Sequence, residues 1–161
     1  MNNEENAIVN VSDMKIVKQP VNLTTMGLGS CLGVSMYDKK MKIGGLLHAR
    51  MPYIMEYNNK ENEYMFVDSG IRVMYRSMLL NGAKKENIEV KLVGGAGMFD
   101  LGDSYQKIGE RNLAAALETL KELRLEVSSK DCGGKKSRTV ILDTTTGFMI
   151  IKSSVGRHKR I

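Results

Sequence analysis

The sequence has no tryptophan, only two cysteines and two prolines, and no long hydrophobic run. Cys31 and Cys132 lie far apart, and no apolar signal segment is seen at the N-terminus, which argues against the disulfide framework of a small secreted domain. We therefore expect a reducing compartment and a cytoplasmic location. Because no apolar run approaches the about 18 residues needed to cross a bilayer, direct membrane insertion is not expected.

Chain length and net charge further limit the expected number of domains and the expected partners. With 161 residues, we expect a single domain over residues 1–161, with a short N-terminal arm and a basic C-terminal tail. The formal net charge of +6 comes partly from Lys135, Lys136, Arg138 and the tail Arg157–Arg160, which we expect to be solvated. No Arg-rich helix or nucleic-acid motif accompanies these charges, so nucleic acid is not an expected partner. Twelve methionines indicate a core filled with adaptable side chains.

Hydrophobic periodicity predicts both helices and strands. Two segments, Tyr64–Leu80 and Ser104–Leu123, repeat apolar residues at the helical period. Thr24–Cys31, with two glycines close together, predicts a sharp turn or a close backbone approach. The predicted strands are Ile8–Val17, Leu32–Tyr37, Lys42–His48, Ile88–Val93, Leu125–Val127, Thr139–Leu142 and Phe148–Lys152. This pattern predicts the α/β fold class, with a mixed or mostly antiparallel sheet covered by two main helices.

A predicted hairpin brings a cysteine and a histidine together. His158 lies in the basic tail, so Cys-His chemistry points to His48. If the turn Asp38–Met41 is centred between Lys39 and Lys40, Cys31 lies directly opposite His48, with Cβ atoms about 5 Å apart. Alternation then assigns the two faces of the hairpin: Leu32, Val34, Met36, Ile43 and Leu47 on one, and Cys31, Gly33, Gly44 and His48 on the other.

Such a pair is what nucleophilic acyl chemistry requires. A free thiol has a pKa near ~8.5, and a neighbouring imidazole can take its proton and leave an attacking thiolate. The glycine-rich approach to Cys31 exposes backbone N–H groups that could hold an oxyanion, without indicating which of them do so. Thr25 is a nearby hydroxyl that could orient the imidazole.

The residues alone also allow a different interpretation. A cysteine beside a strand is more often an inert buried side chain than a nucleophile. Lys-Lys is a poor two-residue turn, and a loop of odd length would break the Cys31–His48 pairing. Composition and spacing leave both interpretations open.

Several ordered motifs resemble the chemoreceptor glutamine deamidase family CheD. The similarity covers most of the chain, from about Thr25 to Lys152. The segments that carry it are Thr25–Cys31, Val34, Tyr37-Asp38, Gly44–Pro52, Tyr64–Asp68, Gly94–Phe99, Ile108–Asn112, Asp131–Gly134 and Arg138. Two departures are Ser69, where the family pattern leads us to expect alanine, and Cys132, where it leads us to expect valine.

The resemblance implies a fold and an activity. The fold would be an α/β sandwich similar to the catalytic domain of the cytotoxic necrotizing factor toxins. The activity would be deamidation of receptor glutamines through a Cys-thioester, with Cys31 as nucleophile, His48 as base and Thr25 assisting, and with Gly29 and Ser30 in the substrate or oxyanion region. No metal or organic cofactor would be needed. Expected partners are the cytoplasmic helices of chemotaxis receptors and the CheC phosphatase.

Two other classes of function remain open at this point. The same pair would serve another Cys-His acyl hydrolase, such as a methylesterase, a protease or a transglutaminase. The chain could also be mainly a regulatory binding module for the receptor or the phosphatase. Loss of activity on removal of the Cys31 thiol would separate an enzyme from a binding module.

Overall fold

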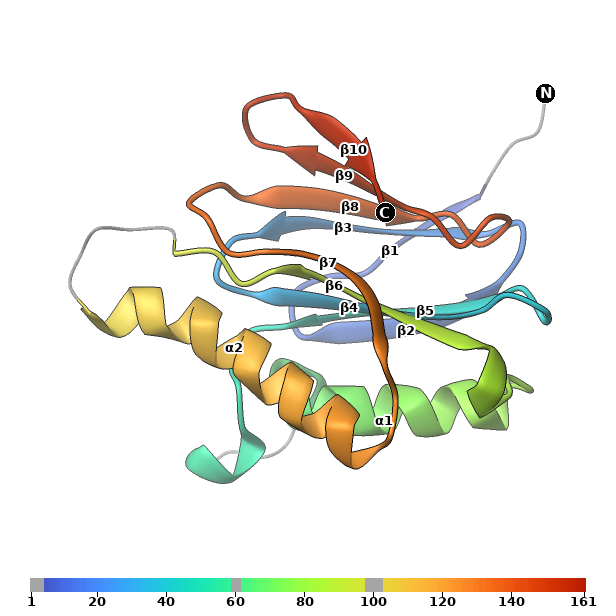
Figure 1. The fold of residues 1–161 in the computed structure, drawn as a ribbon, viewed down its shortest axis with the longest axis horizontal. Coiled ribbons are helices and arrows are strands. Elements are labelled where there is room, and N and C mark those ends of the chain that lie inside the picture. The colour runs from blue at the N-terminus through green and yellow to red at the C-terminus, as the bar shows by residue number, and fades with distance from the viewer. Residues whose placement is uncertain (1–4, 59–61, 98–102) are drawn as a thin grey trace.

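Two β-sheets and a layer of helices are stacked in three layers (Figure 1). The structure, a computed structural model, describes residues 5–58, 62–97 and 103–161, with 103–106 described in their backbone only. The central sheet has the order β2-β5-β4-β6-β7 and the outer sheet the order β1-β3-β8-β9-β10. The strands are β1 Asn6–Ile8, β2 Asp13–Lys18, β3 Asn22–Leu28, β4 Leu32–Asp38, β5 Ile43–Ala49, β6 Ile88–Gly94, β7 Val127–Cys132, β8 Arg138–Leu142, β9 Met149–Ser153 and β10 His158–Arg160.

Both sheets are mixed, with antiparallel pairs in the majority. Only β1-β3 and β6-β7 are parallel pairs among the described strands. The parallel pair β6-β7 is joined through helix α2 (Asp103–Glu122), because parallel neighbours need a crossover connection. The predicted fold class, an α/β protein with mixed or mostly antiparallel strands, is confirmed, with the strands divided between two sheets.

Two main helices cover one face of the central sheet, as predicted. α1 (Val67–Leu80) buries residues spaced three or four apart, which places them on one stripe that faces the sheet. Those buried residues are Val67, Gly70, Ile71, Met74 and Met78. Three short 3-10 helices lie in the connections, at Ile54–Glu56, Glu63–Met65 and Lys85–Asn87.

Alternation along the central strands separates two hydrophobic cores. Along β5, Leu47 packs under the helices, whereas Leu46 packs between the two sheets. Met36, Met74 and Met78 are completely buried in the first core, in agreement with a methionine-filled interior. His48 follows Leu47 on β5, so its side chain belongs to the layer between the sheets.

The structure corrects three predicted segments. Ile8–Val17 is two strands, β1 and β2, separated at Ser12, which has a φ of 59°. Within the segment Thr24–Cys31, residues up to Leu28 belong to strand β3, with a bulge between Thr25 and Leu28, and the chain turns only in the loop 29–31. The basic tail is exposed, as predicted, but it is not a loose end, because residues 158–160 form β10 against β9 and Lys159 pairs with Asp131 at 3.0 Å.

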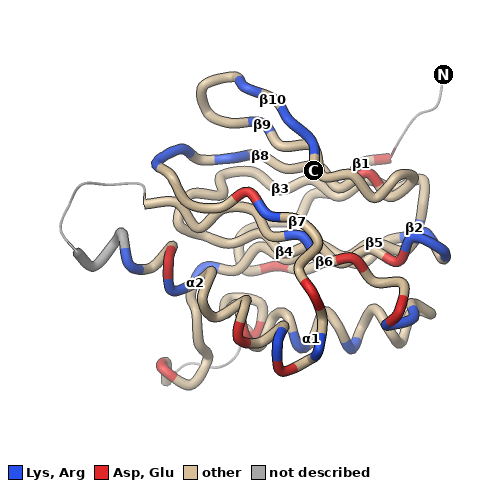
Figure 2. Tube along the Cα trace, in the orientation of Figure 1, with Lys and Arg blue, Asp and Glu red and all other residues tan. Residues whose placement is uncertain are grey.

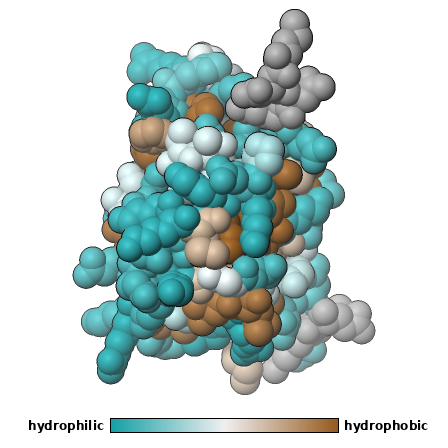
Figure 3. Space-filling model, turned by 90° about the vertical axis from the view of Figure 1, so that its right-hand side faces the viewer, coloured by the Kyte–Doolittle hydropathy of each residue, from teal (hydrophilic) through white to brown (hydrophobic). Residues whose placement is uncertain are grey.

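The surface carries scattered hydrophobic side chains among hydrophilic ones. Seen from the right-hand side of Figure 1, hydrophobic residues gather in the middle and lower part of an otherwise hydrophilic face (Figure 3). Leu80, at the end of α1, is 81% exposed. None of the helices that the structure describes is long and apolar enough to cross a membrane.

Gly109 sets how closely α2 approaches the loop after β6. A Cβ at Gly109 would lie 2.6 Å from the carbonyl oxygens of both Gly95 and Ala96, a distance that real Cβ atoms do not reach. We expect Gly109→Ala to lower the free energy of unfolding by about 2 kcal/mol, because backbone atoms must shift to admit the methyl group. Urea unfolding measures this change.

Gly70→Ala is the matched comparison within α1. Its Cβ would meet the Leu47 side chain at 2.7 Å, and a side chain can move more easily than a carbonyl. Gly70→Ala should therefore cost less than Gly109→Ala. The reverse order would contradict the proposed close packing of α2 on Gly95 and Ala96.

Candidate active site

His48 and Thr25 meet between the two sheets. His48 lies on β5 of the central sheet and Thr25 on β3 of the outer sheet, and both are fully buried. The Thr25 Oγ1 lies 2.7 Å from the Nδ1 of His48. The predicted hydrogen-bond contact between these two residues is confirmed, and it connects the sheets directly.

The hydrogen bonds around Thr25 determine which nitrogen of His48 carries the proton. Thr25 has one hydroxyl hydrogen and donates it to the carbonyl oxygen of Val9 at 2.6 Å. The Nδ1 of His48 must then donate its N–H to Thr25 Oγ1. The Nε2 is left with its lone pair, and it is buried without a hydrogen-bond partner in the described part of the chain. A buried, unpartnered basic nitrogen is poised to accept a proton.

Cys31 lies in the short loop 29–31, which links β3 in the outer sheet to β4 in the central sheet. The predicted register between β4 and β5 is wrong by two residues, because Gly33, not Cys31, is paired with His48. The cause is a four-residue turn, in which the Asp38 carboxylate accepts the N–H groups of Lys40 and Met41. Lys42 closes this turn with a φ of 55°.

A shift of two residues leaves the predicted faces unchanged, since side chains alternate with a period of two. Leu32, Val34, Met36, Ile43 and Leu47 all lie in the core under the helices, as predicted. Cys31 is half-buried and packs against the core between the sheets. Cys31 and His48 therefore face the same layer, although the thiol and the Nε2 of His48 are not hydrogen-bonded to each other.

Two carbonyl groups of the loop 29–31 accept hydrogen bonds from the segment that follows β6. Ala96 N–H donates to the Gly29 carbonyl and Gly95 N–H to the Cys31 carbonyl, each at 2.9 Å. Gly94 has a φ of 111°, and its strand passes so close to Cys31 that a Cβ at Gly94 would collide with the Cys31 carbonyl oxygen. Of the two residues predicted for the oxyanion region, Gly29 uses its N–H on the Gly27 carbonyl. The N–H of Ser30 has no acceptor among the described residues.

Asn112 was quoted within a family motif, but no role was predicted for it. Its Nδ2 donates to the carbonyl of Ser30 at 2.9 Å and to that of Arg50 at 3.0 Å. Asn112 thereby connects the loop 29–31 to Arg50, the residue that follows strand β5. The side chain is completely buried and its Oδ1 has no partner in the described residues. The sequence did contain one signal for a structural role of Asn112, because a polar amide stands there on the apolar stripe of a predicted helix.

Burial sets the protonation of the thiol and the imidazole. Removal from water lowers the pKa of His48 to about 4, and the positive charge of Arg50 adds to this effect. Burial raises the pKa of the Cys31 thiol, against the opposing effects of Arg50 and of its own backbone N–H. Near neutral pH the free protein therefore holds a protonated thiol and a neutral imidazole, not an ion pair.

The second cysteine lies in a different environment. Cys132 ends β7 beside Gly94 and packs against the core under the helices. Burial raises the pKa of its thiol to about 11. Within residues 5–58, 62–97 and 103–161, no three His, Cys, Asp or Glu side chains are grouped to hold a metal ion.

Comparisons with known proteins point to one family. The model of the family described as CheD chemotactic sensory transduction matches residues 51–153. A probable chemoreceptor glutamine deamidase, CheD 1, from Methanosarcina acetivorans is 44% identical over 96% of this chain and 96% of its own. Similar deamidases from Clostridium tetani and Pyrococcus abyssi are 40% and 38% identical and cover 90% and 92% of this chain, and 89% and 91% of their own.

The comparison with solved structures gives a weaker likeness. A Neisseria meningitidis protein of the DUF152 family covers 81% of this chain and 62% of its own, with a TM-score of 0.43 and 13% identity. That likeness is too low to carry an argument about function. Met98 and Phe99, which belong to one of the quoted motifs, lie outside the described residues.

The tautomer and the pKa of His48 can be measured by nitrogen NMR. We expect the Nδ1–H tautomer at neutral pH and a single titration far below 6.5, near 4, because burial disfavours the imidazolium. Thr25→Val removes the acceptor of the Nδ1 hydrogen and should produce a mixture of tautomers. Thr24→Val, on the same strand, is the control and should leave the spectrum unchanged. His158→Gln makes the assignment unambiguous, since the chain has two histidines.

The same shift predicts how stability depends on pH. His48 has a folded-state pKa of about 4 and an ordinary value of 6.5, so its contribution to stability is fully present above 6.5. It is lost as the pH falls from 6.5 towards 4. An NMR midpoint close to 6.5, or the Nε2–H tautomer, would contradict this account of the site.

Asn112→Ala should destabilise the loop 29–31. It leaves the partly buried carbonyls of Ser30 and Arg50 without this donor, at an expected cost of about 2 kcal/mol in the free energy of unfolding. Glu110→Ala, at an exposed position of the same helix, should stay within about 0.5 kcal/mol of the parent protein. Equal urea midpoints for the two variants would show that Asn112 does not tie these segments together.

Proposed function

Because this chain belongs to the CheD family, we propose that it is a deamidase that converts glutamine side chains of chemotaxis receptors to glutamate. Ammonia is the second product. The observation that best supports this chemistry is the free basic nitrogen of His48, buried in the layer that Cys31 also faces. The roles given below to Cys31, His48 and Thr25 are part of the proposal.

In the first step, Cys31 gives its proton to the Nε2 of His48 and attacks the substrate. In the free protein this transfer is unfavourable, because the thiol pKa is raised and the imidazole pKa is lowered. The thiol therefore loses its proton as it attacks the carboxamide carbon, directly or through one water. Thr25 holds the imidazole in the tautomer that leaves Nε2 free.

Attack forms a tetrahedral intermediate with a negative oxygen. The N–H of Ser30 is the available donor in the predicted oxyanion region, and the charge of Arg50 favours anions at this position. The imidazolium then gives its proton to the leaving nitrogen, and ammonia departs. An imidazolium with a pKa of about 4 is a strong acid for this step. A thioester between Cys31 and the substrate remains.

Hydrolysis of the thioester completes the cycle. His48 Nε2 takes a proton from water, the hydroxide oxygen attacks the thioester carbon, and the Cys31 sulfur leaves and recovers the proton. The product is a glutamate side chain on the receptor. Neither step requires a metal or an organic cofactor.

The proposal also includes the setting of the enzyme. The substrates are the cytoplasmic helices of chemotaxis receptors, so the enzyme would act in the cytoplasm as a single domain. The second proposed partner is the CheC phosphatase, which would compete with receptors for the same surface. A methylesterase would use the same thiol and base, but it would remove a methyl group instead of an amide nitrogen.

The nucleophile is tested with matched cysteine variants. Cys31→Ala should abolish the conversion of glutamine to glutamate in the cytoplasmic fragment of the cognate receptor, measured by peptide mass spectrometry. Cys132→Ala should act as the parent protein, because that thiol lies in the core on the other side of the central sheet. Loss of activity in Cys132→Ala with activity kept in Cys31→Ala would show that the nucleophile is wrongly assigned. Full activity of Cys31→Ala in cells would favour a regulatory binding module.

A further inference from the structure

A basic cleft lies between the end of β7, the loop after it and the β9-β10 hairpin. Its volume is ≈ 410 Å³, and its charged lining comprises Asp131, Lys135, Lys136, Arg138, Arg157 and Lys159. Figure 2 shows that lysines and arginines gather along β8, β9, β10 and the loop before β8, where Asp131 on β7 contributes an acidic position. The cleft therefore carries a large excess of positive charge.

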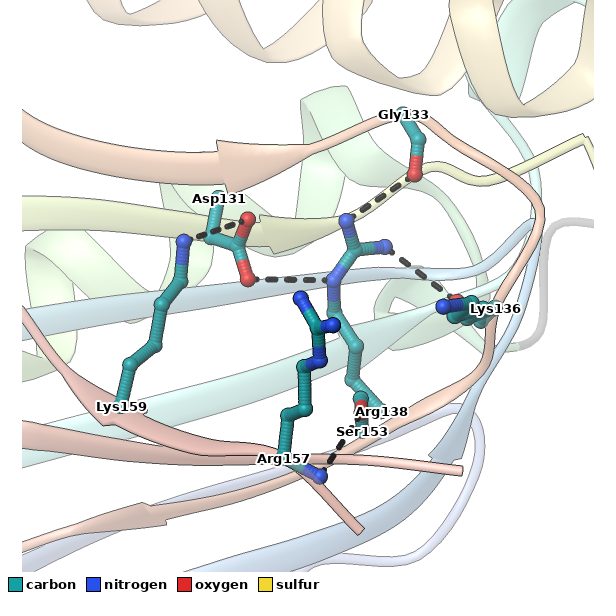
Figure 4. Close-up of polar contacts among 7 residues, drawn as sticks. All are labelled: Asp131, Gly133, Lys136, Arg138, Ser153, Arg157 and Lys159. Carbon is teal, nitrogen blue, oxygen red and sulfur yellow. Dashed lines mark hydrogen bonds and ion pairs between the residues drawn. The ribbon is translucent and has the colours of Figure 1, made fainter. Parts of the chain in front are cut away.

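The single carboxylate of this lining is already occupied. Asp131 accepts from Arg138 Nε at 3.2 Å and pairs with Lys159 at 3.0 Å. Arg138 also donates to the Gly133 carbonyl at 2.9 Å, so its guanidinium is committed to the protein itself. Figure 4 shows Arg157 reaching into the same space beside Arg138, without an ion pair to Asp131. Lys135, Lys136 and Arg157 have no acidic partner among the described residues.

Three hydrogen bonds connect the cleft to the loop 29–31. Gly95 N–H binds the Cys31 carbonyl, Gly133 N–H binds the Gly94 carbonyl, and Gly97 N–H binds the Gly134 carbonyl, each at 2.9 Å. Lys135 follows Gly134 directly, and it lines one depression together with Gly95, Gly97, Gly133, Gly134 and the exposed acidic residue Glu110. In the outer sheet, Arg138 on β8 pairs with Leu28 on β3, and Leu28 lies three residues before Cys31 in the sequence. The basic cleft is thus one loop away from the thiol.

From this arrangement we infer that the basic cleft binds acidic side chains of the receptor helix that flank the target glutamine. The inference rests on the proposed deamidase function and adds a determinant of substrate choice. Carboxylates are the expected ligands because each turnover converts a neutral amide into a carboxylate on the same substrate. A helix presents its neighbouring side chains about one turn, 5.4 Å, apart, so one residue can enter the site while others reach the adjacent cleft.

This arrangement has a consequence for the order of modification. A glutamate made at one position becomes a ligand for the cleft when a neighbouring glutamine enters the site. Receptor helices that already carry negative charge are therefore better substrates than neutral ones. Because the free cations are exposed, the preference should weaken as salt rises.

The test compares two substrates and two matched charge reversals. The substrates are the cytoplasmic fragment of the cognate receptor and the same fragment with the Asp and Glu residues around the target glutamine replaced by alanine. The variants are Lys135→Glu/Lys136→Glu in the cleft and Lys84→Glu/Lys85→Glu, an exposed pair before β6. Initial rates of ammonia release give kcat/KM for each combination. Alkylation of Cys31 by iodoacetamide verifies that its site is unchanged.

We expect the parent protein to prefer the acidic fragment by about tenfold, because two or three exposed ion pairs are each worth a few-fold. Lys135→Glu/Lys136→Glu should abolish this preference and leave the alkylation rate of Cys31 unchanged. Lys84→Glu/Lys85→Glu should keep the preference. Equal rates of the parent on both fragments, or an unchanged preference in Lys135→Glu/Lys136→Glu, would overturn the inference while leaving the deamidase function standing. No release of ammonia from either fragment by the parent would overturn the proposed function itself.

Discussion

The hydrogen bond between Thr25 and His48 is the contact on which the site depends. It is the point at which a polar group of the outer sheet meets one of the central sheet inside an apolar layer. Buried polar groups are costly unless they are paired, so this contact favours one arrangement of the two sheets. Through Val9, the same chain of donors reaches the segment that connects β1 to β2. The packing of the two sheets and the orientation of the His48 imidazole therefore depend on the same hydrogen bond.

The sequence was sufficient to predict which side chains share a layer, because strand alternation survives errors of two residues. The face of Cys31, the face of His48 and the two helices followed from that pattern. The register did not, since it depends on how the Asp38 carboxylate accepts N–H groups within the turn. Strand β3 was missed because Gly27 and Gly29 indicated a turn, whereas the chain stays extended to Leu28 with one bulge and turns in the loop 29–31. Strand β10 was missed because its charged residues are typical of a solvated end; they are exposed, and they also pair with β9.

Asn112 and Asp131 illustrate a limit of a different kind. Each has partners far away in the sequence, and neither stands out in a hydrophobic pattern. Asn112 reaches Ser30 and Arg50 from a helix, and Asp131 gathers Arg138 and Lys159 from two other strands. Contacts of this type become visible only when distant segments are brought together. The family motifs identified these positions without explaining them.

The protonated state of the Cys31 thiol in the free protein affects how fast this thiol reacts with oxidants and electrophiles between turnovers. Peroxides and electrophilic metabolites react with thiolates far faster than with thiols. Because burial raises the pKa of Cys31, little thiolate exists until a substrate amide occupies the site. In the proposed mechanism Cys31 becomes a thiolate only when its substrate is bound, so its oxidation between turnovers is slow compared with that of an exposed, low-pKa cysteine.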